Sequence, residues 1–480
     1  MDTRAIILTL RRALSLYVQF IYPGTPHYDH LNRAMYRSGL NSDFRPACII
    51  LPRNGHDVSI FIKTIRPFII MGRIKFAIVS RGRQQARGCS NIDKGIVLNL
   101  GFLKGIRIGS EWVTIGVAEC WENVYAKLQE EGLACAGALS GGVCGKALQG
   151  GLSIFSSQHG FICDQVIGYK IVLACGTIIH ATAKNHVGLW MALRGGGNNF
   201  GIVISITMRT FKQGSIYGGH LLYPQENFYE QIAILIRELN NPYPCTKTYI
   251  AMSLAWMSDF DTEPIAVNEL YYSEGVENPP ALRQFQPQSQ LPGSNTLRIQ
   301  TLVEAARQHP IENERLPHRS ASMNIHVKAQ LSPIIFGATL FKEAVNRLKD
   351  CKGLICVYSL YPYQPSLLAA SATLGSNVLC VYPNFGPIIM ISIFAWWTKS
   401  EDDDKILREF DDILTKTEQK AEVDGLAVRL KYMNYAASFQ DPIGSYGLDI
   451  KEKLQIISKL YDPHGIFQKG VPGGWKLFDN

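Results

Sequence analysis

The sequence predicts an α+β fold organised in two or three domains. About 46% of the 480 residues are hydrophobic and 18% are charged, so the chain can bury a large core, which excludes disorder as its main state. Short, glycine-rich and β-branched strand patterns dominate the first two-fifths, and longer amphipathic helix patterns come after them. At roughly one domain per 150 residues, the length fits two or three domains.

The region before residue 214 contains short predicted strands and one clear helix. The helix at 121–131 has apolar residues at helical spacing and stops at Gly132, a favourable C-terminal residue. Two strands that flank Cys175-Gly176 predict a hairpin. The predicted strands are 47–51, 76–80, 95–100, 112–117, 169–173, 177–181 and 201–210.

After Gly214 the pattern indicates a second α+β region to about residue 420, followed by a C-terminal segment whose partner the pattern does not identify. Asn227 is the expected N-cap of a helix at 227–239, with Glu230 at the capping-box position. Ser400 is the expected N-cap of a helix with an acidic first turn. The other predicted elements are strands at 250–257, 265–272 and 388–397, the last fully buried, and helices at 341–349 and 448–460.

Charge and cysteine usage exclude several classes of function. The 48 Lys and Arg residues exceed the 40 Asp and Glu residues by only 8, and no basic tract or basic-aromatic stripe indicates nucleic acid. The eleven cysteines include no CxxC pair and no His/Cys cluster at zinc-ligand spacing, so no metal site is predicted. Unpaired cysteines of this kind are typical of a reducing compartment.

Targeting signals also favour a cytoplasmic protein. The apolar stretch 5–10 is too short for a signal peptide, although a truncated gene start would hide one, and no Asn-x-Ser/Thr acceptor occurs. The segment 353–398 has no charged residue, but prolines interrupt it before it reaches the ~20 residues that a membrane span needs. We therefore expect no membrane partner.

Three glycine-rich loops, at 80–88, 137–151 and 193–201, carry the main functional signal. Backbone amides freed by glycine can converge on a pyrophosphate, and glycine lets the backbone approach a flat cofactor. Neither common nucleotide fingerprint fits: Ala147 replaces the Ser/Thr of a phosphate-binding loop, and Phe200 occupies the last glycine position of GxGxxG. Three such loops within about 120 residues predict a large phosphate-containing ligand.

The motifs in and around these loops resemble a known family. They are PACIILP at 46–52, FAI at 76–78, GCSNI at 88–92, GGLSIFS at 150–156, GFICD at 160–164, VLACG at 172–176, LWMALRGGG at 189–197 and NFGIV at 199–203. In this order they resemble the PCMH-type FAD-binding domain of vanillyl-alcohol-oxidase-type flavoproteins. YMNY at 432–435 and YDP at 461–463 are similar to the closing motifs of the berberine-bridge-enzyme-like branch, in particular fungal FAD-linked oxidoreductases of secondary metabolism.

The resemblance implies a bipartite FAD-binding domain, residues 40–214 plus a returning C-terminal segment 421–480. A substrate domain at 215–420 would lay an antiparallel sheet backed by helices over the flavin ring. It implies an FAD-dependent oxidoreductase of the oxidase type, which oxidises a small organic molecule such as a secondary-metabolite intermediate by hydride transfer to flavin N5, with dioxygen as electron acceptor. Tyr432 is a candidate acid/base. The implied cofactor-binding residues are Ser80, Arg81, Gly82, Arg83, Gln84, Gly88, Ser140, Gly141, Gly142, Gly145, Gly150, Gly151, Gly201, Ile202, Val203, Asn434 and Tyr435.

Departures from the family pattern change what is expected of the cofactor. Arg83 stands where many members attach FAD through a histidine, and Ala138 stands near the position of the cysteine that forms a second link, so we expect non-covalent FAD. Gln149 replaces a loop glycine and is expected to weaken binding of the phosphates. Two alternatives follow: a flavin-fold cyclase without net redox chemistry, and a binding protein that has lost FAD.

Overall fold

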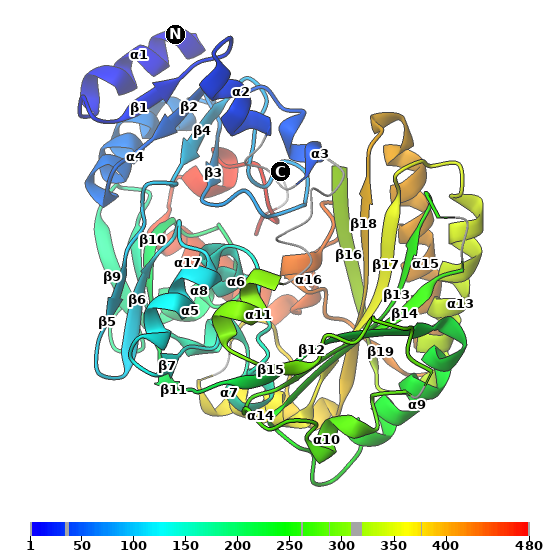
Figure 1. The fold of residues 1–480 in the computed structure, drawn as a ribbon. Coiled ribbons are helices and arrows are strands. Elements are labelled where there is room, and N and C mark those ends of the chain that lie inside the picture. Colours follow the sequence, from blue (N-terminus) through cyan, green and yellow to red (C-terminus); the bar gives the residue numbers. More distant parts are fainter. Residues whose placement is uncertain are drawn as a thin grey trace.

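The described residues of the computed structural model form four β-sheets, and the largest sheet lies opposite the three smaller ones (Figure 1). The structure describes residues 2–33, 38–260, 263–287, 289–308, 319–375 and 377–478. Helices and sheets are mixed, as an α+β fold requires. No helix within these ranges is long and apolar enough to cross a membrane.

The first sheet, in the order β1-β2-β4-β3, positions the first glycine loop. Its strands are β1 (Gln19–Ile21), β2 (Cys48–Leu51), β3 (Phe76–Val79) and β4 (Ile96–Asn99), and β2 and β3 both run parallel to β4. Helix α4 (Gly55–Ile70) connects β2 to β3, and Asn54 caps it by accepting hydrogen bonds from the amides of His56 and Asp57. The loop at 80–88 therefore begins where β3 ends. Helix α1 (Thr3–Ala13) packs on α4, and α2 (Pro26–Arg33) and α3 (Gly39–Ser42) follow.

The second sheet has the order β5-β6-β10-β8-β9. Its strands are β5 (Ile106–Ile108), β6 (Trp112–Gly116), β8 (Val166–Val172), β9 (Ile178–Thr182) and β10 (Ile202–Arg209). Strands β8 and β9 form the predicted hairpin, and Gly176 in its turn has a φ of 83°, which suits glycine. Around this sheet lie α5 (Trp121–Gln129), the pair β7 (Leu133–Ala134) and β11 (Phe211–Lys212), α6 (Val143–Leu148), α7 (Ser156–His159), η1 (Ile162–Gln165) and α8 (Val187–Leu193).

The largest sheet has eight strands in the order β15-β12-β14-β13-β17-β18-β16-β19, all antiparallel. They are β12 (Ile216–Pro224), β13 (Thr248–Met257), β14 (Ile265–Tyr272), β15 (Arg298–Gln300), β16 (Arg319–Lys328), β17 (Ile355–Tyr363), β18 (Ile388–Trp397) and β19 (Ala427–Val428). Every residue of β18 is buried, as the sequence predicted.

One face of the eight-stranded sheet is covered by helices, and the other faces the first half of the molecule (Figure 1). Helices α9 (Phe228–Leu239), α13 (Leu331–Arg347) and α15 (Asp403–Val423) cover the outer face, where alternate apolar residues such as Met252 and Ile391 form a core. The shorter elements of this half are η2 (Gln225–Asn227), α10 (Pro280–Arg283), η3 (Pro383–Phe385) and η4 (Ser400–Asp402). Helices α11 (Leu302–Gln308) and α14 (Pro365–Thr373) come from the same stretch of chain but pack against α5 and α7 of the first half.

One predicted helix cap is confirmed in position and the other is wrong. Asn227 is the N-cap residue of α9, but its side chain makes no capping hydrogen bond, and its oxygen accepts one from the Ser289 hydroxyl. Ser400 lies in the 3₁₀ turn η4, and α15 begins only at Asp403. The Asp403 carboxylate accepts a 2.7 Å hydrogen bond from the Trp397 indole, which fixes the start of that helix against the end of β18.

The C-terminal segment returns to the glycine loops. After η5 (Met433–Tyr435), α16 (Pro442–Ser445), α17 (Leu448–Tyr461) and α18 (Ile466–Lys469), the carbonyl of Gly470 accepts a 2.7 Å hydrogen bond from the amide of Phe76. The Asn199 side chain donates a 3.0 Å hydrogen bond to the carbonyl of Trp475. Gly473 lies so close to Gly88 that a methyl group added to Gly473 would collide with the Gly88 carbonyl. The chain end is thus packed against the first and third loops.

Candidate active site

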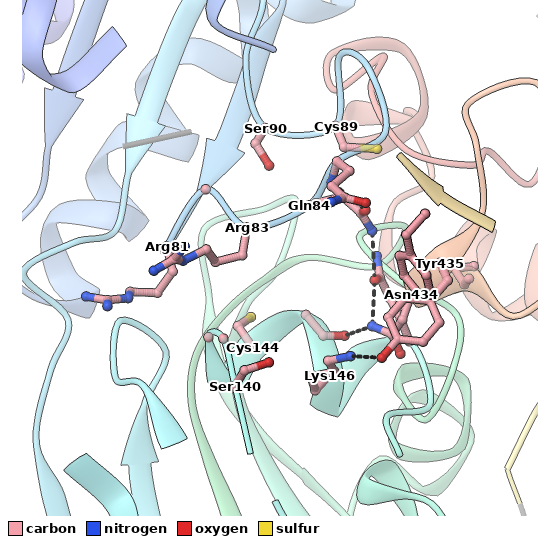
Figure 2. Close-up of a pocket in the computed structure, with 18 of the residues that line it drawn as sticks. Arg81, Arg83, Gln84, Cys89, Ser90, Ser140, Cys144, Lys146, Asn434 and Tyr435 are labelled. Carbon is pink, nitrogen blue, oxygen red and sulfur yellow. Dashed lines mark hydrogen bonds between the residues drawn. The ribbon is translucent and has the colours of Figure 1, made fainter. Parts of the chain in front are cut away.

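A cavity of about 590 Å³ lies between the glycine loops and the inner face of the eight-stranded sheet. Its volume is within the range of about 300–1,000 Å³ that small-molecule and cofactor sites have. Figure 2 shows three segments that converge on it: the loop with Arg81, Arg83 and Gln84, the loop with Ser140 and Cys144, and the pair Asn434 and Tyr435.

The first wall is the loop that follows β3. Gly82 has a φ of 63°, a conformation that glycine adopts without strain. The side chain of Asn41 holds the loop from behind: its nitrogen donates to the carbonyls of Gln84 (3.1 Å) and Ala86 (3.2 Å), and its oxygen accepts from the amide of Gly88 (2.9 Å). Arg81 and Arg83 both line the cavity, so the loop presents two cations to it.

The second wall is the loop before α6. Gly141 has a φ of 88°, and no atom lies within 4 Å of the position where a Cβ would be, so its backbone borders open space. At Gly142 an added Cβ would lie 2.9 Å from the side chain of Arg81, which indicates close contact between the first two walls. Ser140, Cys144 and the glycines of this loop give the cavity a wall made mainly of backbone.

The third wall is the pair Asn434 and Tyr435, and side-chain amides connect it to both loops. The Gln149 side-chain oxygen accepts hydrogen bonds from Gln84 (3.1 Å) and Asn434 (3.0 Å). The Asn434 oxygen accepts from the amide of Gly151 (3.0 Å). The Lys146 ammonium donates a 3.2 Å hydrogen bond to the Tyr435 hydroxyl, as Figure 2 shows. We call Gln84, Gln149 and Asn434 the amide chain.

The fourth wall is the inner face of the eight-stranded sheet. It is mainly aromatic and apolar, with Tyr249, Tyr361, Phe394 and Trp396 among its residues. The Tyr435 ring packs edge-on against Phe394, with ring centroids 4.9 Å apart, and so joins the third wall to the fourth. Two serines, on β13 and β17, form a 2.9 Å hydrogen bond across the strands.

Among the described residues of this sheet that line the cavity are one carboxylic acid and one imidazole, and burial shifts the pKa of both. Desolvation raises the pKa of Glu269 to about 7, because the surrounding protein removes much of the water that would stabilise the carboxylate. Desolvation and the nearby positive charge of Arg298 lower the pKa of His220. Near neutral pH, Glu269 is therefore able both to hold and to release a proton.

The structure brings most of the predicted site residues together around this cavity. Gly88, Gly150, Gly151 and Tyr432 do not line it. Tyr432 is buried behind Tyr435, with ring centroids 5.2 Å apart, and burial raises its pKa well above the ordinary value. The predicted residues that line the cavity are Ser80, Arg81, Gly82, Arg83, Gln84, Ser140, Gly141, Gly142, Gly145, Gly201, Ile202, Val203, Asn434 and Tyr435.

Sequence reasoning missed Glu269 of the sheet and Asn41, the residue that holds the first loop. Glu269 lies in the segment NELYY, where a glutamate in a half-buried strand is normally solvent-facing. The strand alternation places it on one face of β14, but the sequence does not say that this face lines a cavity. Asn41 lies far from the motifs, and nothing in the sequence connects it to the loop 80–88.

Comparison with known proteins identifies the family. Residues 46–182 match the FAD binding domain family. The FAD-dependent monooxygenase FUP4 of Fusarium proliferatum is 31% identical over 468 residues, covering 92% of this chain and 87% of that protein. The chain belongs to the FAD-dependent oxidoreductase family. The FAD-dependent monooxygenase tpcD of Cochliobolus heterostrophus is 32% identical to this oxidoreductase over 457 residues, covering 90% of this chain and 85% of that protein.

Solved structures share the fold of this oxidoreductase. Glucooligosaccharide oxidase from Acremonium strictum superposes with a TM-score of 0.77 at 17% identity, covering 99% of this chain and all of that chain. The predicted α+β class, the resemblance to PCMH-type and berberine-bridge-like flavoproteins, the likeness to fungal enzymes of secondary metabolism and the FAD cofactor are confirmed.

Proposed function

We propose that this oxidoreductase oxidises a small organic molecule between non-covalently bound FAD and the inner face of the eight-stranded sheet, with dioxygen as electron acceptor. The observation that carries the proposal is that one and the same cavity is lined by the glycine loops, the Asn434-Tyr435 pair and the sheet. Loops rich in backbone amides suit a phosphate-containing cofactor, and an aromatic wall suits a planar substrate.

The residues present around the cavity fit FAD. Arg81 and Arg83 supply cationic donors for a pyrophosphate, and the open backbone at Gly141 leaves room for it. Within the amide chain, the Gln149 side chain points toward Gln84 and Asn434 and accepts a hydrogen bond from each, so it joins two walls of the cavity. The residues proposed to hold FAD are Ser80, Arg81, Gly82, Arg83, Gln84, Ser140, Gly141, Gly142, Gly145, Gly201, Ile202, Val203, Asn434 and Tyr435, with Gly88, Gly150 and Gly151 supporting their loops.

The protein residues orient the substrate and handle its proton, and bound FAD supplies the two-electron oxidant. The aromatic side chains of the sheet would hold a planar substrate and exclude water from one side. Lys146 fixes the hydroxyl of Tyr435 at the border between the loop wall and the sheet wall. Tyr432 packs behind Tyr435, and we propose that it positions that ring.

Non-covalent attachment is supported by the side chains that line the cavity. Arg83 cannot form the histidyl link, and Ala138, at the position expected for the second link, has no thiol. Burial raises the pKa of Cys144 to about 12 and that of Cys89 to about 11, so both cavity-lining thiols stay protonated and unreactive at neutral pH. The glucooligosaccharide oxidase of A. strictum, in contrast, carries a 6-S-cysteinyl, 8α-N1-histidyl FAD.

We also propose the division of the chain into an FAD-binding unit of residues 40–214 and 421–480 and a substrate-binding unit of residues 215–420. The contacts of Gly470 with Phe76 and of Trp475 with Asn199 support the assignment of the C-terminal segment to the FAD-binding unit. Seven of the eight strands of the helix-covered sheet, β12 to β18, support a separate unit for the substrate, and β19 of the C-terminal segment pairs with β16 at the edge of this sheet.

The visible absorption spectrum of the purified protein, before and after acid precipitation, tests the proposal. We expect flavin bands at near-stoichiometric amount and full release of the flavin into the supernatant. Flavin that stays with the precipitate would refute non-covalent attachment. A colourless protein that gains no flavin bands with excess FAD would support the binding-protein alternative. Substrate that is converted without flavin bleaching or peroxide formation would support the cyclase alternative.

A further inference from the structure

A second hollow lies on the outer face of the five-stranded sheet β5-β6-β10-β8-β9. It has a volume of about 490 Å³ and shares no lining residue with the cofactor cavity. Figure 1 shows this sheet at the left edge of the molecule, with α5 and α8 on its inner side. Ile115 and Ile206, which pair across the central strands, are buried in the core, and their sequence neighbours Thr114 and Thr207 line the hollow on the opposite face.

The strand register places the polar residues of this hollow in two neighbouring rows. One row consists of Arg107 on β5, Thr114 on β6 and Thr207 on β10. The other consists of Ser205 on β10, Lys170 on β8 and His180 on β9. Because adjacent strands lie about 4.8 Å apart, the strands that carry Arg107 and His180 are about 19 Å apart. Basic side chains therefore stand toward both sides of the hollow, and hydroxyl groups stand between them.

The basic side chains of the hollow lack acidic counterparts. No carboxylate is among the described residues that line it, and neither Arg107 nor Lys170 forms an ion pair with a described residue. The Arg107 guanidinium lies 5.4 Å from the centroid of the Trp112 ring, and this contact restrains it at the rim. Trp112 is itself packed so closely on Gly109 that an added Cβ would lie 2.2 Å from the indole. Cations gathered in this way without counter-charges attract anions.

The hydroxyl groups add donors that suit phosphate oxygens. The Thr114 and Thr207 hydroxyls are hydrogen-bonded to each other at 3.0 Å, and since each hydroxyl carries one hydrogen, one of the two hydrogens is left for a ligand. Ser205 makes no side-chain hydrogen bond to a described residue. A phosphate group offers several strong acceptor oxygens and a charge of about −1.5 to −2 at pH 7. One phosphate group is too small to contact both sides of an array this wide.

We propose that this hollow binds a small molecule with two or more linked phosphate groups. The phosphates lie between Arg107 and Lys170 and accept hydrogen bonds from the hydroxyls of Thr207 and Ser205. The inference is independent of the proposed function. Strand β10 borders both sites, because its first residues Ile202 and Val203 line the cofactor cavity, so the ligand would contact a strand that also holds the cofactor wall.

Calorimetry of the purified protein with sodium tripolyphosphate tests the site. We expect binding that weakens as NaCl rises from about 50 to about 300 mM, because salt screens exposed charges. Arg107→Gln and Lys170→Gln should each weaken binding by about fivefold. Thr207→Val, which keeps the shape and removes the hydroxyl, should weaken it by about threefold. Lys212→Gln removes an exposed cation on β11 outside the hollow and is the matched control, with the affinity of the wild type.

The choice of anion tests the ligand class. Orthophosphate should bind at least about tenfold more weakly than tripolyphosphate, because it makes contacts on one side only. Tighter binding of ATP than of tripolyphosphate would assign the site to nucleotides, and the reverse order would assign it to inorganic polyphosphates; both results support the proposal. Equal affinity for orthophosphate and tripolyphosphate would overturn it. A tetraglutamate peptide that binds more tightly than tripolyphosphate would overturn it in favour of an acidic protein segment.

Two further comparisons locate the binding. A loss in Lys212→Gln equal to that in Lys170→Gln would show attraction by diffuse charge and would overturn the site. Arg81→Gln, on the wall of the cofactor cavity, should leave tripolyphosphate binding unchanged, and a loss there with none in Lys170→Gln would place the anion in that cavity instead. None of these measurements uses flavin, so a colourless protein would refute the proposed function without affecting the result for this hollow.

Discussion

Replacing Glu269 by glutamine should change how the stability of the protein depends on pH. In the unfolded chain a glutamate titrates near 4.5, whereas desolvation in the fold raises the pKa of Glu269 to about 7. Between these values the folded protein retains a proton that the unfolded chain has lost. The free energy of unfolding therefore contains a contribution that is fully present below about pH 4.5 and is lost as the pH rises through about 7.

The size of the effect follows from the same two pKa values. At 1.36 kcal/mol per unit, the shift from 4.5 to about 7 corresponds to about 3.4 kcal/mol. This is an upper bound, because water that enters the cavity screens the carboxylate, and we expect about 2 kcal/mol. Glutamine keeps the shape of the protonated acid but does not ionise. The variant should therefore match the wild type at about pH 5 and be more stable by about 2 kcal/mol above about pH 8.

Differential scanning calorimetry of the wild type and Glu269→Gln, at several values between about pH 5 and pH 8.5, measures this difference. For a chain of this length the stabilisation corresponds to a melting temperature roughly 2 °C higher in the variant at the alkaline end. Glu274→Gln, which removes an exposed carboxylate, should show no such trend. A melting difference between wild type and Glu269→Gln that stays constant with pH would refute the reasoning, because the carboxylate would then titrate alike in both states.

Three further substitutions test the framework of the cavity. Arg194→Met leaves the fully buried carboxylate of Asp164 without its 3.0 Å partner, so the free energy of unfolding in chemical denaturation should fall by about 3–5 kcal/mol. Adding Asp164→Asn should recover part of that loss, and an equal loss in the double variant would contradict this. Gly473→Ala forces a methyl group against the carbonyl of Gly88, so the free energy of unfolding should fall by about 1–3 kcal/mol and the flavin content should fall with it. An unchanged melting temperature would argue against close packing at this position. Gln149→Gly should weaken FAD binding by about tenfold in a titration of the flavin-free protein, whereas tighter binding would show that the side chain obstructs the phosphates.

The parts of the site that the sequence predicted are those that lie in continuous segments. The loops at 80–88 and 137–151 are recognisable in the sequence because the glycines of each loop lie within a few residues of one another. The pair Asn434 and Tyr435 is recognisable because it belongs to the motif YMNY. In each case the backbone conformation and the contact with the cavity depend on neighbours in the sequence.

The sheet wall could not be predicted, because its composition depends on pairings between distant strands. His220, Glu269 and Tyr361 come from three strands that are distant in the sequence; the strand register pairs His220 with Glu269, and all three residues line the cavity. Helix α4 was missed for a different reason. Seven of its sixteen residues are buried and Pro67 lies in its last turn, so the sequence shows neither a clear polar face nor an uninterrupted helical pattern.

Gln149 shows how a departure from a family pattern can be compensated within the fold. At the sequence level its side chain replaces a loop glycine and suggests a damaged phosphate site. In the structure that side chain joins Gln84 to Asn434, two residues that come from opposite ends of the chain. Tyr435, next to Asn434, then contacts Phe394 of the sheet. The side chain at position 149 therefore links the two loop walls to Asn434 and, through the neighbouring Tyr435, to the sheet wall. Under the proposed function, a loss of Gln149 should affect the binding of both FAD and substrate.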